Sequence, residues 1–244
     1  LLHTSGLTYD FLRATNIDYA YRKLQVGLVR PGYTLKDMID QLAQLPLEFS
    51  PGERWNYSLA TDVLGYLVEV ISGKSLPEYL REVIFAPLGM HDTSFSIEAD
   101  KVARFASCYQ RNLKKEMELS DDGQDSEFAN RSFYSGGGGL ISTVGDYYRF
   151  CQMLLGGGTL DGKRIIGSRT LAFMVRNHLP GGVPMTEMAS GGFSESDYAG
   201  VGFGLGFASK LDPVCNGYPG STGSYFWGGL ASTLFWVYPV EELV

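Results

Sequence analysis

The chain has 244 residues, of which 44% are hydrophobic and 19% charged, a composition typical of folded globular proteins and unlike that of disordered chains. Its 27 acidic and 20 basic residues leave a net charge of −7, which is the wrong sign for a protein that binds the phosphate backbone of nucleic acids. The three cysteines stand far apart with no C-x-x-C pair, which argues against a disulfide framework or a thiolate metal site.

The sequence predicts no membrane span, because no run of about 18 or more apolar residues occurs. No export signal is visible at the start of the chain, which favours the cytoplasm as its location. The chain begins at Leu1 without an initiator methionine, and it stops at Val244, where the apolar pattern predicts the start of a further strand. We therefore expect a sequence that has been trimmed at both ends.

Apolar residues at helical spacing predict three amphipathic helices in the first part of the chain. The first helix covers 35–42, between an N-cap at Thr34 and a stop at Pro46. The second covers 58–72, and the third begins at a Ser75 cap and ends at Pro87. In the second helix four apolar residues form a stripe that we expect to face the core: Leu64, Leu67, Val68 and Ile71.

The pattern changes after the third helix. Residues 97–132 are a polar stretch, which predicts a surface excursion with one hairpin. A helix should run from a Thr143 cap to the glycines at 156–158, another should begin at Ser168, and 181–200 has the composition of a mobile loop. The apolar patterns over 201–207 and 229–238 predict strands.

This order of elements predicts a single α+β domain over 1–244. Residues 8–135 should form a mostly helical part with the surface excursion, and residues 136–244 should supply helices and the strands of a sheet. Nothing in the sequence specifies an oligomeric state.

Common signatures of cofactor and metal sites are missing from the sequence. Residues 157–163 match the spacing of a phosphate-binding loop, but Arg164 stands where that loop needs a Ser or Thr hydroxyl. The histidines share no metal-ligand spacing, and no serine is flanked as in G-x-S-x-G. We expect no cofactor and no metal, and a surface or capping role for His178.

Six short segments nevertheless form a coherent series along the chain. They are Leu2-His3-Thr4-Ser5-Gly6-Leu7, Phe49-Ser50-Pro51-Gly52 with Tyr57-Ser58, Pro87-Leu88-Gly89-Met90 with Asp92-Thr93, Gly136 to Leu140 with Asp146, Gly157 to Lys163, and Gly202 to Gly206. In this order they resemble serine hydrolases built like class C β-lactamases, which include the family VIII carboxylesterases and relatives of the D-alanyl-D-alanine peptidases. The resemblance implies a β-lactamase/transpeptidase-like fold, with an antiparallel sheet flanked by helices and a mostly helical region.

Tyr57, in the triplet Tyr57-Ser58-Leu59, matches the tyrosine of that family's second motif. The resemblance implies that it is the general base and acid of the reaction. A phenol ordinarily titrates near a pKa of ~10, but beside a lysine ammonium it can accept the proton of a serine hydroxyl and later return it to the leaving group. The alternative is a tyrosine that only packs its ring at the start of a helix.

Trp227-Gly228-Gly229 matches the third motif, which is Lys-Thr-Gly in β-lactamases and peptidases and commonly Trp-Gly-Gly in family VIII esterases. The resemblance implies that the motif lies on an edge strand beside the nucleophile, and that the N–H of Leu230 is a donor of the oxyanion hole. Loss of the Lys-Thr pair removes the groups that would hold a carboxylate and leaves an apolar wall, which favours neutral esters. The alternative is that Trp227 is a strand residue that only packs in the hydrophobic core.

The remaining element of the family, Ser-x-x-Lys, does not occur in these residues, because no lysine has a serine three positions before it. In the family this motif precedes the His-Thr-Ser-Gly segment, so we expect it ahead of Leu1.

The leading hypothesis is a serine carboxylesterase that acts on small or medium acyl esters through an acyl-enzyme, with a small-molecule ester as its partner. Within the same family the alternatives are a β-lactamase, a D-alanyl-D-alanine peptidase or an acyltransferase. Because the nucleophile is missing from these residues, an inactive fragment or a binding module is the alternative from another class.

Overall fold

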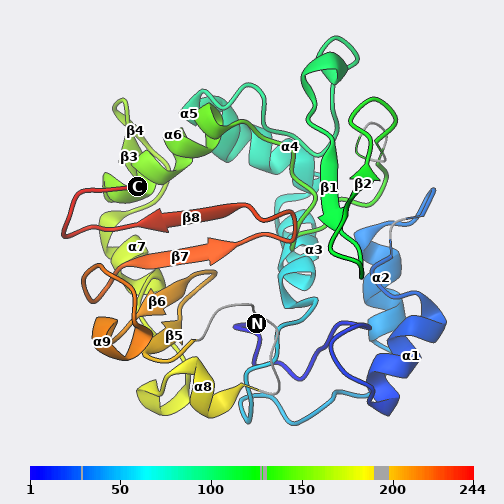
Figure 1. Cartoon of the computed structure of the whole chain (residues 1–244), viewed down its shortest axis with the longest axis horizontal. Coiled ribbons are helices and arrows are strands. Elements are labelled where there is room, and N and C mark those ends of the chain that lie inside the picture. The colour runs from blue at the N-terminus through cyan, green and yellow to red at the C-terminus, as the bar shows by residue number, and fades with distance from the viewer. Residues whose placement is uncertain (29, 127, 129–130, 190–197) are drawn as a thin grey trace.

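The structure is a computed structural model that describes residues 1–28, 30–126, 128, 131–189 and 198–244 (Figure 1). Helices come first along the chain, as the periodicity predicts. They are α1 (Asn16–Leu24), α2 (Leu35–Leu42), α3 (Ala60–Ser72), α4 (Leu76–Leu80), the π-helical η1 (Arg81–Phe85) and α5 (Ala86–Leu88). The apolar spacing does not predict α1, whose signal in the sequence is the capping box of Thr15 and Asp18.

The second predicted helix exists as α3, but most of its predicted apolar stripe does not face the core. Leu64, Leu67 and Ile71 are 42%, 40% and 82% exposed, whereas Ala60 and Gly65 are buried. The buried face consists of small residues because other segments approach it closely. A Cβ added to Gly65 would lie 3.0 Å from the Cα of Gly136 and 3.1 Å from Leu76. Close approach of the backbone, rather than apolar spacing, therefore decides which face of α3 is covered.

The polar excursion contains the expected hairpin. After η2 (Val102–Arg104), the strands β1 (Cys108–Arg111) and β2 (Met117–Asp121) pair antiparallel. The helix capped by Thr143 is α6 (Val144–Leu155), and the helix expected at Ser168 is α7 (Ser168–Met174). The short strands β3 (Thr159–Leu160) and β4 (Lys163–Arg164) lie between these two helices.

The segment 181–200, predicted as a mobile loop, contains ordered turns where the structure describes it. These are η4 (Pro180–Gly182) and α8 (Met185–Met188), while 190–197 lie outside the described residues. Met185 is fully buried, and the N–H of Trp55 donates to the carbonyl of Met188 over 2.9 Å. The chain around α8 is therefore part of the packed structure.

The main sheet consists of β5 (Val201–Phe203), β6 (Ala208–Lys210), β7 (Tyr225–Gly228) and β8 (Leu234–Val237), antiparallel in that spatial order. The strand predicted over 201–207 ends early, because the chain turns between β5 and β6 at Gly206, whose φ is +97°. The strand predicted over 229–238 begins only at Leu234, because 229–233 form the turn between β7 and β8. The helix α9 (Pro213–Asn216) lies between β6 and β7 along the chain.

Figure 1 shows α3 between α1 and α2 on one side and the β5–β8 sheet on the other. One buried cluster joins the sheet to the loop ahead of α3: Trp55, Leu179, Met185, Val201, Phe203 and Ala208, with Tyr57 and Trp227 packed against them. The residues of the second and third motifs therefore meet where the helical part contacts the sheet. None of the helices in the described ranges is long and apolar enough to cross a membrane.

Candidate active site

The N-terminal segment 3–8 positions the loop that carries Tyr57. It runs beside 52–59 and accepts three backbone hydrogen bonds from it: Gly52 to Thr4 over 2.7 Å, Asn56 to His3 over 2.7 Å and Leu59 to Thr8 over 3.4 Å. Two of the segments on which the family resemblance depends are thus hydrogen-bonded to each other. Tyr57 itself lies three residues ahead of the first residue of α3.

His3 is the buried side chain that holds this loop. Its Nδ1 accepts the backbone N–H of Ser58 over 3.1 Å and lies 3.2 Å from the Ser58 hydroxyl. Its ring centroid is 4.6 Å from that of Tyr57. Burial is the main cause that lowers the pKa of His3 to about 4. His3 is therefore a neutral imidazole that accepts a backbone N–H and supports the loop that carries Tyr57.

Tyr57 and Trp227 are in direct contact, although 170 positions separate them in the sequence shown. Their rings are stacked with centroids 5.7 Å apart, and the Trp227 indole N–H donates a hydrogen bond to the phenol. Tyr9 packs near Tyr57 at 5.4 Å, and Tyr198 stacks on Trp227 at 6.2 Å. The second and third motifs thus form one aromatic cluster at the start of α3 and the end of β7.

Burial raises the pKa of Tyr57, as do the charges of Asp62 and Tyr198, while the hydrogen bond from Trp227 lowers it. The phenol is therefore protonated at neutral pH in this arrangement. A base at this position needs a neighbouring cation, which is the role that the family assigns to a lysine.

The expectation of an edge strand for Trp227-Gly228 needs a correction. β7 lies inside the sheet, between β6 and β8. Its pairing with β6 covers only Tyr225 and Phe226, whereas its pairing with β8 continues to Gly228. The end of β7 is thus paired on one side only, which leaves the backbone of the motif open toward the side of β6.

The two glycines of the motif are required by the hairpin itself. A Cβ on Gly228 would lie 2.9 Å from a methyl of Leu234, and one on Gly229 would overlap the Thr233 hydroxyl. The Gly229 N–H donates to the carbonyl of Thr233 over 2.7 Å. Leu230 follows at the tip of the turn with a fully exposed side chain. Close packing within the turn is therefore one physical reason for glycine at both positions.

The other sequence candidates lie apart from this cluster. His178 contacts the carbonyl of Phe173 at the end of α7 over 2.7 Å, which is the capping role expected of it. Within the described ranges, no three His, Cys, Asp or Glu side chains gather in a way that could hold a metal ion.

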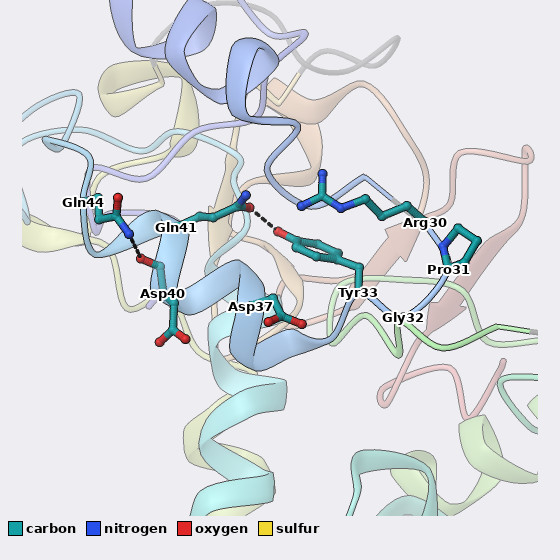
Figure 2. Close-up of a pocket in the computed structure, with 8 residues that line it drawn as sticks. All are labelled: Arg30, Pro31, Gly32, Tyr33, Asp37, Asp40, Gln41 and Gln44. Atoms are coloured by element: carbon teal, nitrogen blue, oxygen red, sulfur yellow. Dashed lines mark hydrogen bonds between the residues drawn. The ribbon is translucent and has the colours of Figure 1, made fainter.

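A pocket of about 440 Å³ lies at α2 and the loop before it (Figure 2). Its polar side chains bind one another: the Tyr33 hydroxyl donates to Gln41 over 2.5 Å, and the Arg30 guanidinium lies 4.1 Å from the centre of the Tyr33 ring. None of the site residues predicted from the sequence lines it. We therefore place the candidate active site at the aromatic cluster around Tyr57 and Trp227.

Two residues of this site were not singled out by motif reasoning, His3 and Asp62. The sequence signal for His3 is its place in the His-Thr-Ser-Gly segment. Asp62 carries no such signal, because only the fold shows that its side chain is 2% exposed in the first turn of α3.

Comparison with known proteins finds a matching family model and several similar sequences. The sequence model of the family described as beta-lactamase matches residues 1–244. Protein Rv1367c of Mycobacterium tuberculosis is 35% identical over all of this chain and 59% of its own length. Esterase EstB of Burkholderia gladioli is 29% identical over 94% of this chain and 58% of its own length. The chain thus spans about three fifths of the length of these relatives.

Among solved structures, the fold is similar to that of EstCE1, described as a hydrolase with promiscuous acyltransferase activity. The TM-score is 0.77 at 27% identity, and the match covers 99% of this chain and 63% of EstCE1.

Proposed function

Because the chain belongs to the beta-lactamase family, we propose that the whole protein is a serine hydrolase that cleaves carboxylic esters of small or medium acyl chains. The contact between Tyr57 and Trp227 carries the proposal, since it joins the second and third motifs in one site. The similarity to an esterase and to a hydrolase with acyltransferase activity supports the same class of reaction.

The proposed reaction begins when Tyr57, as a phenolate, takes the proton of a serine hydroxyl. The serine oxygen attacks the ester carbonyl, and the tetrahedral intermediate then expels the alcohol, which receives the proton from Tyr57. Water repeats the sequence on the acyl-enzyme and releases the acid. No Ser-x-x-Lys occurs among these 244 residues, so the proposal places the nucleophilic serine and its lysine elsewhere in the whole protein.

A lysine ammonium beside Tyr57 would oppose the effect of burial on the phenol. Burial disfavours the phenolate, whereas a positive charge within about 4–6 Å favours it. The hydrogen bond that Trp227 donates also stabilises the phenolate, so Trp227 contributes to the activation of the base as well as to the wall of the site.

The N–H of Leu230 is proposed as one donor of the oxyanion hole, with the N–H of the nucleophile as the other. The one-sided pairing at the end of β7 supports this role, because an open backbone edge can receive a substrate carbonyl. Neutral esters are the proposed substrates because Trp227 and Gly228 supply neither a charge nor a hydroxyl for a carboxylate.

Transfer of the acyl group to an alcohol instead of water is the second candidate, favoured by the acyltransferase activity in the description of EstCE1. It uses the same acyl-enzyme and differs only in the acceptor.

The test is hydrolysis of p-nitrophenyl butyrate and of nitrocefin by the whole protein, with and without an added alcohol. We expect ester turnover to exceed nitrocefin turnover by orders of magnitude, with free acid as the main product. Comparable turnover of nitrocefin would identify a β-lactamase, and a predominant transfer product would identify an acyltransferase. No turnover of any substrate would refute the proposal.

A further inference from the structure

Gly136 and Gly137, which begin the glycine run 136–139, lie directly on the first turns of α3. A Cβ on Gly136 would overlap the carbonyl oxygen of Thr61 and lie 3.0 Å from Gly65. A Cβ on Gly137 would lie 3.0 Å from both the Asp62 carboxylate and the Thr61 hydroxyl. Glycine at these positions therefore allows a backbone contact that side chains would prevent.

Asp62 holds the run in this position. Its carboxylate accepts hydrogen bonds from the Ser135 hydroxyl and from the backbone N–H of Gly137, the latter over 3.4 Å. Burial raises the pKa of Asp62, and hydrogen bonds from Ser135 and from the backbone of Gly137 and Gly136 partly offset that rise. The side chain is 2% exposed, so these donors replace water around a buried carboxylate.

The same carboxylate acts on the tyrosines of the site. A Cβ on Gly137 would lie 3.4 Å from the Tyr9 hydroxyl, and the ring of Tyr9 packs 5.4 Å from that of Tyr57. Burial is the main cause that raises the pKa of both Tyr9 and Tyr57, and the negative charge of Asp62 raises both further. Asp62 thus contacts the glycine run directly and influences Tyr57 through space.

We propose that Asp62 is a positioning residue of the active site, which fixes the glycine run against α3 and sets the electrostatic environment of Tyr57. This inference rests on the proposed function, since it assigns Tyr57 as the base. The other titratable groups that face Tyr57 are His3 in the N-terminal segment, Tyr9 directly after it, and Tyr198 ahead of β5.

The experiment is the pH profile of kcat/KM for p-nitrophenyl butyrate with the whole protein and three variants. Asp62→Asn keeps a hydrogen-bond acceptor but removes the charge. We expect the acid limb of its profile to move to lower pH by roughly 0.5–1 unit, because loss of a nearby negative charge lowers the pKa of Tyr57. A purely structural role would not move this limb.

Ser135→Ala keeps the charge and removes one anchor of the glycine run. We expect kcat/KM to fall several-fold while the acid limb stays in place. Asp100→Asn removes a carboxylate from the exposed surface and is the matched control, with a profile like that of the wild type. Circular dichroism checks that each variant is folded.

An acid limb that stays in place in Asp62→Asn, or moves to higher pH, would overturn the proposed role. If Asp62→Asn does not fold, the test depends on Ser135→Ala. A kcat/KM equal to that of the wild type in Ser135→Ala would then overturn the proposed role of Asp62. Absence of ester hydrolysis in the wild type would overturn the proposed function and this role with it, whereas activity with an unmoved limb would overturn the role of Asp62 alone.

Discussion

At the scale of single residues, the proposed reaction depends on the protonation of Tyr57. Burial and the negative charge of Asp62 favour the neutral phenol, whereas the hydrogen bond from Trp227 favours the phenolate. Tyrosine is suited to this position because it can carry a proton in both directions, provided that a cation offsets the cost of burying its charge.

Tyr57→Phe in the whole protein should lower kcat for p-nitrophenyl butyrate by about 10²–10⁴-fold, the usual contribution of a general acid–base residue. The change removes only the hydroxyl, so KM should change much less than kcat. Tyr19→Phe, at a tyrosine that is 63% exposed, is the matched control. Near-normal kcat in Tyr57→Phe would rule out the assignment.

His3 should make the stability of the protein pH-dependent. Its pKa is about 4 in the folded protein and near 6.5 in the unfolded chain, so between these values the unfolded chain binds more protons. The free energy of unfolding should therefore fall as the pH falls from 6.5 toward 4, by up to about 3 kcal/mol from this group.

Urea unfolding of the wild type and His3→Asn at pH 7 and pH 5 measures this effect. Asn offers an acceptor to the Ser58 N–H but does not titrate. The free energy of unfolding of His3→Asn should therefore fall less between pH 7 and pH 5 than that of the wild type. His91→Asn, at an exposed histidine, should behave like the wild type. An equal loss in wild type and His3→Asn would contradict the role of burial.

At the scale of elements, the contact between α3 and the glycine run is made by backbone atoms. Apolar spacing predicts a core-facing stripe on α3, and the structure instead covers the face of Ala60, Asp62 and Gly65. A periodic pattern of apolar residues locates a helix well. It does not identify the buried face of α3, because that face consists of small residues and one acid rather than large apolar side chains.

Gly136→Ala should lower the free energy of unfolding by about 1–3 kcal/mol, because the new methyl group overlaps the backbone of α3. Gly138→Ala is the matched control two positions away, where no atom lies within 4 Å of the added Cβ. Urea unfolding of both variants measures the difference. Equal stability of the two variants would show that the run is not tightly packed on α3.

At the scale of the whole molecule, the predicted fold class is confirmed. The protein is α+β, with an antiparallel sheet and helices arranged as in the β-lactamase family. Residue order alone supports this class, because six short segments in series are more specific than any one of them. The division into parts at 8–135 and 136–244 stays a prediction.

A fluorophosphonate probe, which reacts with activated serines, tests where the nucleophile lies. We expect labelling of the whole protein and none of the 244-residue chain by itself, because these residues contain no Ser-x-x-Lys. Mass spectrometry of the labelled peptide identifies the serine. Labelling of the 244-residue chain would contradict this view of the site.

The sequence by itself determined the family, the places of most helices and the identity of Tyr57 and Trp227 as candidates. These features depend on local spacing and on short motifs, which are visible without coordinates. Only the tertiary structure decided that the two rings stack, that β7 lies inside the sheet with its end paired on one side, and that His3 and Asp62 support the site. The physical reason is that these features arise from contacts between segments far apart in the chain, where burial and close backbone approach, rather than residue type, decide which side chains meet.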